Sequence, residues 1–147
     1  MIDVIDQQLL AALMDDSRCS LKTLAGITGL SSPSVGERLR RLEERGVLKG
    51  YTVEVDPKHF GYLLQAIVRI RPLPGQLQEV ERQIQAIPEF TECDKVTGDD
   101  CFIARLHVRT MDQLDTLLDR LNGYAETNTA IVKKTPVKRR LPPLAGG

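Results

Sequence analysis

Residues 29–46 have the sequence GLSSPSVGERLRRLEERG, which predicts a helix with one buried and one exposed face. Val35, Leu39 and Leu42 recur at steps of four and three residues, the spacing of a narrow apolar stripe. A helix that begins with small polar residues and continues with arginines suits the DNA major groove, because nothing bulky blocks its entry and its donors reach base edges and phosphates. An ordinary amphipathic helix with a solvated charged face is the alternative.

Two further helices are predicted before this one. Asp3 is placed to cap a helix whose apolar residues step by four, and Ser20 to cap a short helix that ends at Gly29. Ser31 or Ser32 then caps the next helix after a short turn that contains glycine. Two helices joined in this way, with a third to support them, are typical of a helix-turn-helix.

The periodicity of the apolar residues changes after Gly46. Over residues 47–55 they alternate with a period of two, which predicts a strand. This strand is expected to form a wing beside the helix-turn-helix or the start of an arm that leads out of it. The Asp-Pro pair at residues 56–57, followed by Gly61, indicates a domain boundary.

Beyond residue 62 the pattern predicts a βαββαβ order. The predicted elements are a strand over 63–71, a helix over 77–87, strands over 90–96 and 101–109, a helix between Thr110 and Gly123, and a strand over 127–134. This order is typical of a ferredoxin-like sandwich, in which one face of a four-stranded antiparallel sheet carries both helices. We therefore expect an α+β protein with an N-terminal winged helix-turn-helix over 1–55, a linker over 56–62, the sandwich over 63–141 and a tail over 142–147.

The sheet face away from the two helices is expected to be uncovered. Its predicted side chains are Leu63, Gln65, Ile67, Arg69 and Arg71 from one strand and Cys101, Ile103, Arg105, His107 and Arg109 from another. The mixture is too apolar for a fully solvated face and too polar for a core. Packing against the same face of a second copy would cover it, and a two-fold dimer suits a two-fold DNA site. A sheet that tolerates a few exposed isoleucines is the alternative.

Composition limits the classes of protein that this chain can belong to. The 147 residues can bury one substantial core or two small ones. Twenty basic residues balance twenty acidic residues, so any DNA binding must come from the local placement of charge. Three cysteines without a CxxC pair suggest neither a disulfide framework nor a metal site. No basic leader or membrane-length apolar run is present, so we expect a cytoplasmic protein that does not enter a membrane.

Several short motifs occur along the chain in a characteristic order. They are IDVID at 2–6, DDSR at 15–18, LA at 24–25, GLS at 29–31, RLRRL at 38–42, GVLKGY at 46–51, TGD at 97–99 and TNT at 127–129. Their order and spacing resemble the Lrp/AsnC transcriptional regulators, the feast/famine proteins, over nearly the whole chain. The resemblance implies a winged helix-turn-helix joined to a regulatory domain for effector binding and oligomerisation, dimers that assemble further into octamers, and in many members an amino-acid effector.

The predicted recognition helix supplies the candidate DNA contacts. They are Ser32, Ser34, Glu37, Arg38, Arg40 and Arg41. The serines and Glu37 would probe base edges, and the arginines would bind guanine edges or phosphates. Arg38 lies nearest the buried stripe, so it could instead hold Glu43 or a neighbouring helix. A second basic run at residues 133–140 could contact phosphates or an acidic partner, although a solvated tail is the simpler interpretation.

The resemblance places the effector near the turn between the second and third strands of the regulatory domain, with the last strand close by. The residues implied are Thr97, Gly98, Asp99, Asp100, Thr127 and Thr129. Glycine lets backbone amides approach a carboxylate, and an aspartate can face an ammonium group. A plain hairpin turn is the alternative. The chain departs from the family pattern of Gly-Asp-Tyr-Asp, because Asp100 and Cys101 occupy the last two positions, which could alter the choice of effector or abolish binding.

Together these features predict a sequence-specific transcriptional regulator that binds double-stranded DNA and responds to an amino acid or a related metabolite. An architectural DNA-wrapping protein without an effector is one alternative. Siroheme decarboxylases resemble the same two-domain layout, but His59 and His107 lack a second histidine at metal-ligand spacing and no nucleophile motif is present. We therefore expect no catalytic residue, metal or cofactor.

Overall fold

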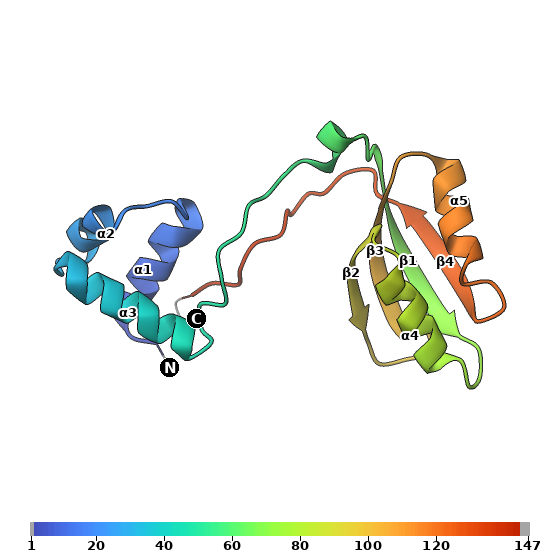
Figure 1. The fold of residues 1–147 in the computed structure, drawn as a ribbon, viewed down its shortest axis with the longest axis horizontal. Coiled ribbons are helices and arrows are strands. Elements are labelled where there is room, and N and C mark those ends of the chain that lie inside the picture. Colours follow the sequence, from blue (N-terminus) through green and yellow to red (C-terminus); the bar gives the residue numbers. More distant parts are fainter. Residues whose placement is uncertain (1, 145–147) are drawn as a thin grey trace. The chain divides into compact units, whose positions relative to one another are not determined.

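The computed structural model describes residues 2–144, which form two compact units (Figure 1). The helical unit contains the residues up to 54 together with those from 139 onward, and the sandwich unit contains residues 55–138. Residues 145–147 of the predicted tail lie outside the described part of the chain.

Three helices form the helical unit: α1 (Val4–Asp15), α2 (Leu21–Thr28) and α3 (Ser32–Glu44). The predicted caps of the first two are confirmed, and Ser31 is the serine that caps α3. Gly29 ends α2 in the left-handed region at φ +74°, which glycine adopts without steric cost and which turns the chain into α3. The predicted helix-turn-helix is therefore present.

The apolar stripes of the three helices meet in one core. Its buried side chains are Leu9, Leu13, Leu24, Val35, Leu39 and Leu42. The stripe predicted for α3 is completely buried, and its other face is left free. Leu21 and Ile27 of α2 are exposed, because a helix of this length presents only a narrow face to its neighbours.

The strand predicted over residues 47–55 is wrong for the single chain. The backbone from residue 49 to residue 56 is free of regular secondary structure, and Val53 is 81% exposed. An alternating pattern requires a neighbouring strand, and residues 2–144 supply none here. The wing expected beside the helix-turn-helix is thus not formed within one subunit.

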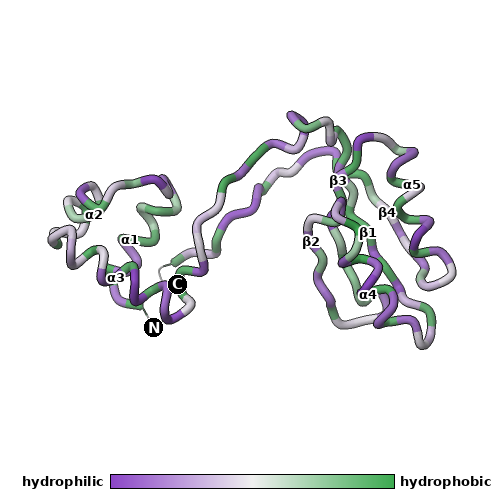
Figure 2. Tube along the Cα trace, viewed as in Figure 1, coloured by the Kyte–Doolittle hydropathy of each residue, from purple (hydrophilic) through white to green (hydrophobic). Residues whose placement is uncertain are grey.

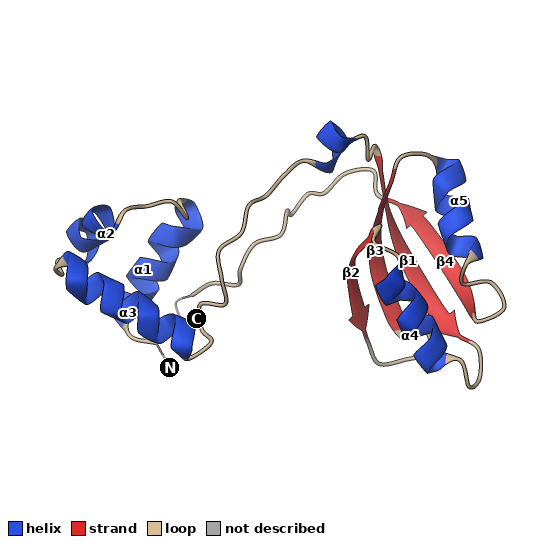
Figure 3. Ribbon diagram, in the orientation of Figure 1, coloured by secondary structure: helices blue, strands red, loops and turns tan. Residues whose placement is uncertain are grey.

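The sandwich unit begins with a short 3₁₀ helix, η1 (Pro57–Phe60), and continues in the predicted βαββαβ order. Its elements are β1 (Leu64–Pro72), α4 (Leu77–Ala86), β2 (Phe90–Lys95), β3 (Phe102–Val108), α5 (Met111–Asp119) and β4 (Ala125–Ile131). The antiparallel sheet has the strand order β2-β3-β1-β4 (Figure 3).

Both helices of this unit pack on the same face of the sheet. The core joins Val80 and Ile84 of α4 and Leu114 and Leu117 of α5 to one face of the central strands, whose buried residue Val68 pairs with Ala104. The opposite face contains Ile103, which is partly exposed, beside charged residues. The open sheet face predicted from the alternation is confirmed.

Candidate DNA-binding and effector sites

The N-terminus of α3 is a compact serine cap. The Ser31 hydroxyl accepts a hydrogen bond from the Ser34 backbone amide at 3.3 Å and donates one to the Ser34 hydroxyl at 2.9 Å. Ser34 is exposed and Ser32 is half-buried. The first turn therefore presents small side chains to solvent, Ser34 and Pro33 among them, as entry into a groove requires.

Glu37 holds both arginines on the exposed face of α3. Its carboxylate accepts hydrogen bonds from Arg40 at 2.5 and 3.0 Å and from Arg41 at 3.3 Å. Arg40 also pairs with Glu44. The hydrogen bond from Arg40 is the main cause that lowers the pKa of Glu37. In the free protein this face is therefore a mutually neutralised cluster, which we call the Glu37 clamp: Glu37, Arg40, Arg41 and Glu44.

Arg38 points toward α1 instead. One of its guanidinium nitrogens lies 2.6 Å from an Asp3 oxygen and 3.1 Å from an Asp6 oxygen. Asp6 is buried, with 7% of its surface exposed. The hydrogen bond from Arg38 lowers the pKa of Asp3, and the same contact raises the pKa of Arg38. Of the alternatives left open by the sequence, the structure has Arg38 bound to the neighbouring helix rather than to Glu43.

The turn between β2 and β3 carries the predicted acidic pair, and an arginine joins it. Arg71 near the end of β1 lies 3.7 Å from an Asp99 oxygen and 3.4 Å from an Asp100 oxygen. The Asp99 side chain is 89% exposed, and Gly98 has a φ of +107°. Arg71 was not among the residues predicted for this site, because its distance to the turn depends on the register between β1 and β3.

The two threonines of β4 do not join this cluster within the chain. Thr127 pairs with Ile70 and Thr129 pairs with Val68 in the antiparallel register. Paired residues point to the same side of a sheet, and Ile70 and Val68 are buried beneath the helices. Arg71, next to Ile70 in sequence, points to the open face. The predicted effector residues are therefore divided between the two faces of the sheet.

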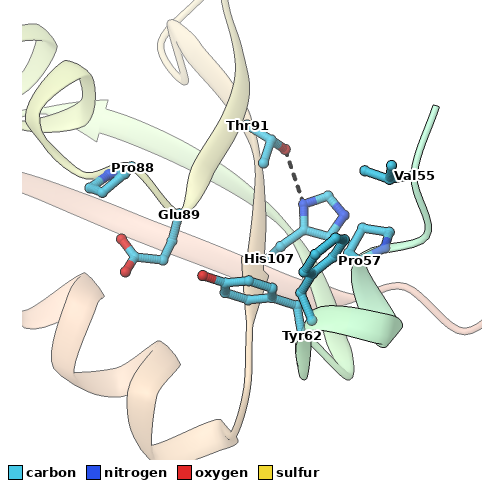
Figure 4. A pocket seen from close by; sticks show the side chains of 8 residues that line it. Val55, Pro57, Tyr62, Pro88, Glu89, Thr91 and His107 are labelled. Carbon is cyan, nitrogen blue, oxygen red and sulfur yellow. Dashed lines mark hydrogen bonds between the residues drawn. The ribbon is translucent and has the colours of Figure 1, made fainter. Parts of the chain in front are cut away.

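A shallow pocket of about 280 Å³ lies on the open face near the start of the sandwich unit (Figure 4). It is lined by Val55, Pro57, Phe60, Tyr62, Pro88, Glu89, Thr91 and His107. The Thr91 hydroxyl and a ring nitrogen of His107 are 3.1 Å apart. Burial, and secondarily Arg105, lowers the pKa of His107. The sequence analysis missed this pocket because its residues come from three separate segments.

Within residues 2–144 neither a metal-ligand cluster nor a membrane-spanning helix is found. No group of three or more His, Cys, Asp or Glu side chains within this range is placed to hold a metal ion. None of its helices combines the length and the apolar character needed to cross a membrane.

Comparison with known proteins gives matches over both units. Residues 2–43 match the AsnC-type helix-turn-helix domain, and residues 65–142 match the Lrp/AsnC ligand binding domain. The chain is 36% identical to the transcriptional regulator LrpA of Mycobacterium tuberculosis, over 87% of this chain and 86% of the relative. It is 31% identical to the regulator FL11 of Pyrococcus horikoshii, over 91% of each.

A solved structure extends the likeness to three dimensions. It is the feast or famine regulatory protein of M. tuberculosis complexed with L-methionine. The TM-score is 0.87 at 34% identity, and the match covers 96% of this chain and 98% of the other.

Proposed function

This chain belongs to the Lrp/AsnC family of transcriptional regulators, and from that premise we propose that α3 reads a DNA major groove and that the sandwich unit binds an amino acid that changes this activity. The observation that carries the proposal is the exposed face of α3. Its three apolar residues are buried against the other helices, while its serines and its two clamped arginines face solvent.

The Glu37 clamp suggests how the helix changes from its free to its bound form. DNA phosphates compete with Glu37 for the guanidinium groups of Arg40 and Arg41, which are exposed and free to rotate away. Glu37, once released, is placed to accept a hydrogen bond from a cytosine amino group. Ser32 and Ser34 approach base edges from the first turn. We assign Arg38 to positioning α3 on α1 rather than to DNA.

The Arg71 cluster fits the two charges of an amino acid. A guanidinium group binds a carboxylate, and Asp99 and Asp100 provide carboxylates for an ammonium group. Thr97 and the Gly98 amide are available for further hydrogen bonds in the same turn. The M. tuberculosis relative was solved with L-methionine, which supports an amino acid as the class of ligand. Thr127 and Thr129 lie on the other face and would reach such a ligand only from another subunit.

We further propose that two copies pack their open sheet faces together, and that the dimers associate into a higher oligomer such as an octamer. The mixed apolar and charged composition of that face supports the dimer. We place the protein in the cytoplasm with the DNA that it regulates.

Binding to the DNA upstream of the protein's own gene tests the first part of the proposal. The variant Arg40→Ala/Arg41→Ala should weaken binding in a gel-shift titration and lower the slope of log Kd against log salt by about one for each lost phosphate contact. Equal affinity of the variant and the unmodified protein would refute the role of α3.

Calorimetric titration with each of the twenty amino acids tests the second part. At least one should release or absorb heat with the unmodified protein, and Arg71→Leu should abolish that signal. If none gives heat while DNA binding persists, the protein is better described as a DNA-wrapping protein without an effector.

A further inference from the structure

Residues 2–54, the N-terminal part of the helical unit, lack the excess positive charge that DNA binding usually uses. Residues 2–54 contain seven Lys and Arg side chains against eight Asp and Glu side chains. Three of the arginines, Arg38, Arg40 and Arg41, are already paired with carboxylates. Because neutralising phosphates with Lys and Arg supplies much of the affinity of DNA-binding proteins, further cations in this unit would add to the exposed Arg18, Lys22 and Lys49.

A run of free cations is found at the other end of the chain, which we call the basic segment, residues 133–140. Its basic side chains are Lys133, Lys134, Lys138, Arg139 and Arg140, and the sequence has no Asp or Glu from residue 133 to its end. All five are exposed, and the backbone is neither helix nor strand. Across residues 2–144 none of the five pairs with a carboxylate. Figure 2 shows hydrophilic colouring along this part of the chain.

The chain from residue 139 onward is part of the helical unit. Arg139 and Arg140 thus belong to the same compact unit as α3, although they follow the sandwich unit in sequence. Leu144, close to the end of the described chain, is half-buried. Arg139 and Arg140 are therefore attached to the unit that carries the recognition helix, whereas Lys133, Lys134 and Lys138 belong to the sandwich unit.

We propose that Arg139 and Arg140, the end of the basic segment that belongs to the helical unit, form a second DNA-binding element that contacts the phosphate backbone of the duplex read by α3. The inference rests on the proposed function of α3. Fully extended, two adjacent residues span about 7 Å, enough to reach neighbouring phosphates. Lys and Arg side chains on an irregular backbone make phosphate contacts that carry no base sequence, so this element adds affinity without adding specificity. Because Arg139 and Arg140 belong to the unit that carries α3, DNA is favoured over an acidic protein as their partner.

The test is fluorescence anisotropy of the full-length protein on two labelled duplexes, its own upstream DNA and an unrelated sequence. The variant Arg139→Gln/Arg140→Gln should weaken binding to both duplexes by the same factor, about tenfold at moderate salt, and lower the salt slope by about two. Arg139→Lys/Arg140→Lys should restore both quantities. The matched control Lys58→Gln/Arg120→Gln removes two exposed positive charges from the sandwich unit and should leave both unchanged.

Several results would overturn the inference. An unchanged affinity and slope in Arg139→Gln/Arg140→Gln, alongside weakened binding in Arg40→Ala/Arg41→Ala, would refute the basic segment and leave the role of α3 intact. A change in the sedimentation mass of the variant with an unchanged salt slope would assign the segment to assembly instead. If the unmodified protein binds neither duplex, the proposed function fails, and the inference fails with it.

Discussion

Replacing Arg38 by methionine separates a structural role from a DNA-binding role. The contact with Asp3 contributes little to stability, because the Asp3 side chain is 54% exposed and solvent screens the pair. The contact with Asp6 matters more, since its side chain is only 10% exposed and would be left as a buried carboxylate without its charged donor. Such a loss costs about 1–3 kcal/mol. Water can enter where the partly exposed Arg38 stood, so we expect about 2 kcal/mol for the whole change.

Hydrogen exchange followed by mass spectrometry measures this loss in the full-length protein. A destabilisation of about 2 kcal/mol lowers the protection of the α1 and α3 amides by about thirtyfold if they exchange through opening of the helical unit. Asp6→Asn should lower this protection by less in the Arg38→Met variant than in the unmodified protein, because Asp6 and Arg38 act as a pair. The helical unit stays mostly folded, so the DNA affinity of Arg38→Met at moderate salt should change by less than about twofold, with an unchanged salt slope.

The opposite pattern would refute this assignment. If Arg38→Met leaves the protection of α1 and α3 unchanged but raises the Kd for DNA more than about tenfold and lowers the salt slope by about one, Arg38 contacts DNA directly. The ion pairs of Arg38 with Asp3 and Asp6 would then exist only in the protein without DNA.

Three further predictions concern the other charged groups. Glu37→Gln should free Arg41 and leave Arg40 paired with Glu44 alone, tighten binding to an unrelated duplex several-fold and raise the salt slope by about one; unchanged non-specific binding would contradict the Glu37 clamp. Arg71→Leu should abolish the calorimetric response to the effector while effector-free DNA binding stays as in the unmodified protein. Because burial lowers the pKa of His107, the native state binds its proton less readily than the unfolded state, so the free energy of unfolding should fall as the pH drops below about 6.5. His107→Gln should remove that part of the loss in urea titrations between pH 7 and pH 5, and an identical loss in the variant would exclude His107 as its source.

The three helices of the helical unit were predictable because their signals are local. Asp3, Ser20 and Ser31 each accept a hydrogen bond from an amide three residues later, and the apolar period fixes which side of each helix is buried. The alternation over residues 47–55 is just as clear, yet no strand forms. A periodic pattern indicates which side chains favour burial. The strand that would pair with these residues must come from elsewhere, and the described chain does not provide it.

The candidate effector site shows the same limit in the sandwich unit. The turn at residues 97–100 follows from its glycine and aspartates, whereas the presence of Arg71 beside it follows from the pairing of β1 with β3. The face of Thr127 and Thr129 follows from the pairing of β4 with β1, and a slip of one residue would move both to the open side. Strand register is set by contacts distant in sequence, so motifs identified one by one do not show which of them lie together within one chain.

The balanced charge of α3 implies that sequence specificity and affinity for DNA come from different groups of the protein. Its residues 32–44 contain three arginines and three glutamates, and the arginines are paired in the free protein. Such a helix attracts DNA only weakly at long range. It forms its DNA contacts only where phosphates and base edges together take the place of the carboxylates that pair with its arginines. That arrangement favours discrimination between sequences over raw affinity. We expect the affinity to come from cations that are already free, and Arg139 and Arg140 supply two of them in the helical unit. Removing Arg139 and Arg140 should therefore weaken binding to every duplex equally, whereas removing Glu37 should erode the difference between the correct duplex and the others.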